Sequence, residues 1–238
     1  MTDAFRKRLE VFNNEQANLQ HFFFTSLAVR RCAIDIPDVV GLMNDSLYWR
    51  VTHQGTIVST FIAMGRIFDD KSKHNIGRIR RVIENTPEIF SIECLKQRKA
   101  AQGVYADEYV KDRHALDPSR ADAMLFGIDY FQGIYDARYK AIRHSFAHKR
   151  LGTVDQINAL LAKTDIEEMK RMCSFLDALW RALDQLHRNG LDPVMRPRTF
   201  VLAPARLPQG STPGEEAYRD ARAAILTAVG YDHASDDV

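Results

Sequence analysis

Apolar residues recur every three or four positions along most of the first 189 residues, which is the spacing of one buried face on an α-helix. Two early stretches show this spacing clearly: residues 3–24, and residues 39–69 with Gly41 and Gly55 as candidate breaks. No run of alternating β-branched residues indicates a strand. The pattern therefore predicts an all-α bundle, whose remaining helices cover residues 75–85, 87–102, 119–146 and 165–188.

Capping residues and prolines indicate where these helices begin and end. Ser119 is the predicted N-cap of the helix over 119–146, with Asp122 three residues later in the capping-box position. Asn189 and Gly190 end the last long helix, and five of the eight prolines follow them. The predicted organisation is a bundle over 1–189, a proline-rich tether over 190–213, and a short helix with a tail over 214–238. We expect that helix, residues 214–229, to dock on the bundle or on a partner.

Composition narrows the class of protein. A hydrophobic fraction of 45% excludes wholesale disorder, and a net charge of +2 excludes a strongly basic coat while allowing a local basic patch. The three cysteines, Cys32, Cys94 and Cys173, lie far apart, which argues against a disulfide scaffold or a structural zinc site. The first ten residues carry charges and no apolar signal region. We expect a cytoplasmic protein with no membrane association.

The segment from Tyr139 to Arg150 carries the most chemistry in the chain. Arg143 lies about 100° around the helix from Ile142, beside the apolar stripe. His148 lies roughly 140° from Arg143 on an ideal helix, so both side chains serve one site only if the helix ends or loosens between them. Such an end would group a cation, a titratable imidazole and further basic residues in a way that suits phosphate recognition. The predicted buried side of this helix is Leu125, Ile128, Phe131, Tyr135, Ile142 and Phe146.

This arrangement resembles the HEPN superfamily, whose hallmark is an arginine followed after four to six residues by a histidine near the end of a bundle helix. Arg143 and His148 fit with a four-residue gap, and Phe146-Ala147-His148 is similar to the abortive-infection AbiU-like branch. The run Met64-Gly65-Arg66-Ile67-Phe68-Asp69-Asp70 and the long amphipathic helix after the motif also look like that branch. The resemblance covers residues 1–189.

The resemblance implies a helical homodimer that cuts RNA without a metal or cofactor, in prokaryotic antiviral defence or a toxin–antitoxin system with an antitoxin or defence partner. The ribose 2′-hydroxyl would attack the adjacent phosphate. A histidine suits proton transfer near neutral pH, and an arginine suits the charge that develops on phosphorus. Arg143 and His148 are therefore the candidate catalytic residues. The supporting candidates are His144 and Asp69, and the RNA-binding candidates are Lys140, Lys149 and Arg150.

Other interpretations of these residues stay open. Arg143 and His148 could simply stabilise a helix C-terminus, where cations are favourable. His144 and His148 have the i, i+4 spacing of helix-borne metal ligands, but no third ligand is identifiable by spacing. Asp69 could orient a motif residue across the bundle, or pair with Arg66 three residues earlier. The same dimer could also bind RNA, a nucleotide or a protein without catalysis.

The chain has none of the common nucleotide-binding motifs, and its densest basic run covers residues 71–81. No GxxxxGK loop, Gly-rich dinucleotide turn or GxSxG elbow occurs, which argues against P-loop NTPases, Rossmann enzymes and α/β-hydrolases. The basic run is either an RNA-backbone track or a solvated helix face. Its members are Lys71, Lys73, His74, Arg78, Arg80 and Arg81.

Overall fold

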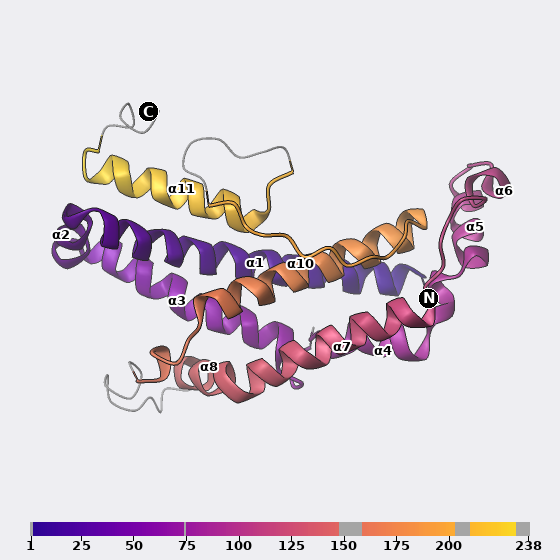
Figure 1. The fold of residues 1–238 in the computed structure, drawn as a ribbon, viewed down its shortest axis with the longest axis horizontal. Helices are drawn as coiled ribbons and strands as arrows, with labels where there is room; N and C mark the ends of the chain where they lie inside the picture. The colour runs from indigo at the N-terminus through magenta and orange to yellow at the C-terminus, as the bar shows by residue number, and fades with distance from the viewer. Residues whose placement is uncertain (1, 74, 148–158, 203–209, 232–238) are drawn as a thin grey trace.

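Every regular element in the computed structural model is helical over the residues that it describes, 2–73, 75–147, 159–202 and 210–231 (Figure 1). This confirms the predicted all-α class. Within those ranges, no helix is both long enough and apolar enough to cross a bilayer. The elements are α1 (Thr2–Asp35), α2 (Pro37–Asp45), α3 (Leu47–Phe68), α4 (Gly77–Asn85), η1 (Pro87–Phe90), α5 (Ile92–Ala101), α6 (Ala106–Tyr109), α7 (Pro118–Ile134), η2 (Tyr135–Tyr139), α8 (Lys140–Ala147), α10 (Ile166–Asn189) and α11 (Pro213–Ala228).

Helix α1 runs along the length of the molecule and packs against α3, α10 and α11 (Figure 1). It continues to Asp35 rather than ending at residue 24, because Ala28, Val29 and Cys32 extend its buried stripe. The predicted apolar positions of its first part are all buried. These are Phe5, Leu9, Phe12, Leu19 and Phe23.

Short polar side chains, rather than glycines, set the breaks in the next part of the chain. The predicted helix over 39–69 is two helices that meet at Ser46, where the hydroxyl accepts the Trp49 N–H at 3.5 Å. The candidate breaks at Gly41 and Gly55 were wrong, since both residues lie inside helices. Ser91 divides the predicted helix over 87–102 in the same way, accepting the Cys94 N–H at 3.1 Å. A side-chain acceptor satisfies a helix-start N–H, which glycine cannot do.

The helical path that leads to the motif begins at Pro118, and the predicted Ser119 cap was wrong. Asp117 caps α7 instead, accepting the Arg120 N–H at 2.9 Å, with proline at the first helical position. The path continues to Ala147 but contains a five-residue π-helical segment, η2. A π segment changes which face later residues present, and such segments are frequent at functional sites. The predicted stripe is fully buried at Ile128, Phe131, Tyr135 and Ile142, and half-buried at Leu125 and Phe146.

Helix α10 confirms the helix predicted over 165–188 and contributes a long buried face to the core. Asp165 caps its start by accepting the Glu168 N–H at 3.0 Å, and Gly190 ends it with a left-handed φ of 62°. The whole apolar stripe is buried. Its members are Met169, Met172, Phe175, Leu176, Leu179, Leu183 and Leu186.

The C-terminal helix docks on the bundle of its own chain. Residues 191–202 have no regular structure, and α11 then begins with a capping box between Thr212 and Glu215. Tyr218, Ile225 and Leu226 are buried, and α11 lies alongside α1 (Figure 1). Of the two docking surfaces expected for this helix, the structure therefore shows the bundle.

Candidate functional site

The structure describes four of the seven residues predicted for the site. Arg143, His144 and Lys140 lie on α8, and Asp69 is the C-cap of α3. The other three, His148, Lys149 and Arg150, lie outside the described residues. The geometry of the site is therefore that of the arginine and its surroundings.

Arg143 forms an ion pair with Asp69 across the bundle. Its Nη1 lies 3.3 Å from Asp69 Oδ2, and the two side chains are 26% and 10% exposed. The alternative partner of Asp69, Arg66, instead places Nη1 3.6 Å from Oε2 of Glu15 on α1. Asp69 thus connects α3 to α8. Of the two hypotheses for this carboxylate, the structure shows the pairing with a motif residue across the bundle and not the pairing with Arg66 three residues earlier.

Gly65 allows Arg143 to lie directly against the backbone of α3. A Cβ atom at this position would stand 2.9 Å from both Cγ and Nε of Arg143. Arg143 Nε is buried and has no hydrogen-bond partner among the described residues. The stem of the guanidinium is therefore confined between helices, while Nη1 reaches the carboxylate.

The loop after α3 holds Asp69 in place. The Asp69 N–H donates to Gly65 O at 2.9 Å, and Asp69 Oδ1 accepts the Lys71 N–H at 3.1 Å. The Asn75 side-chain amide donates to the carbonyl of Asp70 at 2.8 Å and also reaches the carbonyl of Asp69 at 3.3 Å. Since its backbone and one oxygen are already engaged, the carboxylate presents its other oxygen to Arg143 in a fixed direction.

Tyr135, the first residue of the π segment, lies beside this ion pair. It is fully buried, and its hydroxyl has no hydrogen-bond partner within the described ranges. The pKa of Tyr135 is raised to about 12, mainly by burial and also by the Asp69 carboxylate, while the Arg143 guanidinium opposes the rise. The hydroxyl is therefore neutral at physiological pH and close enough to feel both charges.

Tyr139, the last residue of the π segment, anchors it to α10. Its hydroxyl donates to Glu168 Oε1 at 2.6 Å, and Arg138 Nη1 lies 3.1 Å from Glu168 Oε2. Glu168 is 5% exposed. The segment before Arg143 is therefore fixed at one end by a charge-assisted hydrogen bond and at the other by packing alone.

Substitution by phenylalanine is expected to affect the free energy of unfolding differently at Tyr135 and at Tyr139. Tyr135→Phe is expected to change the free energy of unfolding little, or to raise it by up to about 1 kcal/mol, because it removes a buried hydroxyl with no partner. Tyr139→Phe is expected to lower it by about 1.5–3 kcal/mol, because a buried carboxylate loses a donor. Urea denaturation of both variants measures the difference. Equal effects would contradict the asymmetry.

One further cation of α8, Lys140, and one cation of α4, Arg80, also have carboxylate partners. Lys140 Nζ lies 2.6 Å from Asp136 Oδ1, and that hydrogen bond raises the lysine pKa. His144 lies exposed on α8. In the basic run over residues 71–81, Arg80 pairs with Glu84 at 2.9 Å and with Asp129 at 2.6 Å, so the charge of this arginine is offset, while His74 lies outside the described residues. The residues that the structure describes contain no group of three or more side chains able to hold a metal ion.

Sequence reasoning missed two members of this site. Gly65 stood in the run used for the resemblance, but nothing in that run shows that a helix crosses closely there. Tyr135 fell on the predicted apolar stripe, so its position was correct while its hydroxyl went unnoticed. The available signal for each was its residue type, a glycine inside a helix and a tyrosine on a buried face.

Comparison with protein-family models, with curated proteins and with solved structures found no match.

Proposed function

We propose that this protein is a metal-independent endoribonuclease of HEPN type, acting as a homodimer in prokaryotic antiviral defence or a toxin–antitoxin system. The observation that supports it best is the Arg143–Asp69 ion pair at 3.3 Å. It holds a guanidinium at a fixed place five residues before His148, at the end of a helical path with a π segment. A fixed, partly exposed arginine is what stabilisation of a phosphorane-like charge requires.

The reaction needs no atom beyond the RNA and two proton-transfer groups. The ribose 2′-oxygen forms a bond to the adjacent phosphorus and loses its proton to a base, while the bond from phosphorus to the 5′-oxygen breaks and that oxygen takes a proton from an acid. The products are a 2′,3′-cyclic phosphate and a 5′-hydroxyl. His148 is the proposed proton carrier, and Arg143 stabilises the extra negative charge. A two-fold dimer would supply a second imidazole to the same cleft, so that acid and base are separate groups.

Asp69 is the proposed positioning residue for Arg143. The carboxylate occupies Nη1, and the packing of the stem on Gly65 restricts the remaining freedom of the side chain. In this proposal the other guanidinium nitrogen, Nη2, faces the phosphate. Such preorganisation reduces the cost of aligning the cation when RNA binds.

The test is cleavage of total RNA and of tRNA in EDTA, by the wild-type protein and by His148→Ala purified in the same way. Cleavage by the wild type alone, with cyclic-phosphate and 5′-hydroxyl ends, is the expected result. Cleavage by both proteins, or cleavage that EDTA abolishes, would overturn the proposal.

A second candidate is a dimer that binds RNA, a nucleotide or a protein without cutting RNA. It is supported by the same cations, Arg143 held by Asp69 and Lys140 beside it, because they suit an anionic partner whether or not His148 transfers a proton. RNA binding that weakens with salt and survives His148→Ala, in the absence of any cleavage by the wild type, distinguishes this candidate from the nuclease.

A further inference from the structure

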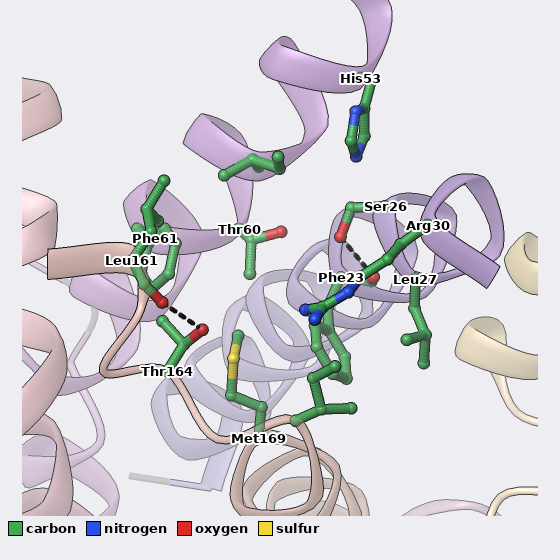
Figure 2. Close-up of a pocket in the computed structure, with 12 residues that line it drawn as sticks. Phe23, Ser26, Leu27, Arg30, His53, Thr60, Phe61, Leu161, Thr164 and Met169 are labelled. Atoms are coloured by element: carbon green, nitrogen blue, oxygen red, sulfur yellow. Dashed lines mark hydrogen bonds between the residues drawn. The ribbon is translucent and has the colours of Figure 1, made fainter. Parts of the chain in front are cut away.

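A pocket of about 230 Å³ opens between α1, α3 and the chain that leads into α10 (Figure 2), and neither Arg143 nor Asp69 is among the residues that line it. Residues from all three segments face it, and most are apolar. The apolar members are Phe23, Leu27, Ile57, Phe61, Leu161, Ile166 and Met169, and the polar members are Ser26, Arg30, His53, Thr60 and Thr164.

The three hydroxyl groups of this pocket already donate to backbone carbonyls. Ser26 donates to Phe23 O, Thr60 donates to Thr56 O and Thr164 donates to Leu161 O, each at 2.8 Å. Their protons are therefore committed within their own helices or turns. Hydrogen-bond donors for a ligand must come from the other two polar residues.

Arg30 and His53 supply those donors from two different helices. Arg30 lies exposed on α1 and has neither an ion pair nor a hydrogen bond within the described part of the chain, whereas its neighbour Arg31 pairs with Asp35 at 2.8 Å. Figure 2 shows the Arg30 guanidinium and the His53 ring directed toward the space between the helices. Burial lowers the pKa of His53, so its imidazole is neutral near pH 7 and offers one N–H.

The charge and size of the pocket restrict what it can hold. One cation without a carboxylate partner matches one negative charge, and the apolar walls match a hydrocarbon body. A volume of about 230 Å³ lies below the roughly 300–1,000 Å³ of typical ligand pockets, which suits a compact ligand. A polyphosphate or an oligonucleotide would bring more charge and bulk than these groups accommodate.

We propose that this pocket binds a small amphipathic monoanion, a medium-chain carboxylate, with its head on Arg30 and His53 and its chain against Phe23, Leu27 and Met169. The head would receive a charge-assisted hydrogen bond from the guanidinium and a neutral one from the imidazole. The chain would replace water along the apolar wall. This site is independent of the proposed RNA cleavage, so neither proposal depends on the other.

The experiment titrates the full-length protein with octanoate and, separately, with 1-octanol, which has the same chain but no charge. Binding is followed by calorimetry and by the methyl NMR signal of Met169, which reports on the pocket itself. We expect saturable octanoate binding that shifts this signal. We also expect Arg30→Gln to weaken octanoate binding by about tenfold or more while leaving octanol binding unchanged.

Arg31→Gln is the matched control, since it removes the same charge one position along α1 from an arginine that already has a partner. Octanoate affinity retained in Arg31→Gln and lost in Arg30→Gln supports the site. Equal loss in both variants would show a general effect of surface charge and overturn it. An unmoved Met169 signal, or equal octanoate affinity in wild type and Arg30→Gln, would also overturn it.

Discussion

Replacing Arg143 with lysine is expected to lower RNA cleavage by roughly 10²–10³-fold, although the charge is kept. The guanidinium is planar and can pair with Asp69 through one nitrogen while another faces the phosphate. A lysine ammonium is a single point charge that must choose between them. Because the lysine ammonium can still pair with Asp69 when no RNA is bound, the free energy of unfolding should change by only about 1 kcal/mol or less. Initial cleavage rates in EDTA, with urea denaturation alongside, measure both effects.

Arg66→Lys is the control for this prediction. Arg66 lies on the neighbouring helix and faces Glu15 rather than Asp69, so the same substitution there should leave the cleavage rate unchanged. A full cleavage rate in Arg143→Lys would show that the site uses positive charge alone, which would contradict the positioning role of Asp69. Equal losses of cleavage rate in Arg143→Lys and Arg66→Lys would show a general effect of replacing arginine on this surface, and not a specific role of Arg143.

The course of α10 could be predicted from the sequence because independent signals agree. Its apolar stripe has the helical period, Asp165 caps the start, and Gly190 provides the left-handed residue that ends it. The break at Ser46 was less visible, since apolar periodicity continues across it and the hydroxyl that caps α3 acts through local geometry. The π segment could not be predicted from the sequence, because Tyr135 at its start and Ile142 after its end are both buried and the apolar stripe therefore looks continuous.

The site shows a similar division between local and distant information. The pairing of Asp69 across the bundle was one of two hypotheses, and sequence spacing alone favoured Arg66 equally. The choice depends on Glu15, which lies far away in the chain and occupies Arg66 at 3.6 Å. The role of Gly65 depends on how closely α8 approaches α3, which no single-helix pattern contains. The sequence therefore did not allow us to predict which side chains of different helices contact one another.

Removing α11 by ending the chain at residue 209 is expected to lower the free energy of unfolding by about 5 kcal/mol, since three buried side chains lose their packing. Tyr218, Ile225 and Leu226 are buried against the bundle. The deletion also uncovers the α1 surface around Phe24, which is fully buried in the intact chain. A loss of that size is a large share of the stability of an ordinary domain. Chemical denaturation of the shortened chain measures it.

A chain that ends at Tyr231 is the control, because it keeps α11 and should unfold like the full chain.

Gly214→Ala tests the same contact without deletion: its Cβ would stand 2.6 Å from Cε2 of Phe24, which should cost about 1–3 kcal/mol of the free energy of unfolding. Gly41→Ala, where the added atom meets nothing within 4 Å, should instead add about 0.5–1 kcal/mol. Unchanged stability on truncation would mean that α11 contributes nothing to the bundle and is available to a partner protein. In that case Gly214→Ala should also leave the free energy of unfolding unchanged, because its effect depends on the contact between α11 and Phe24.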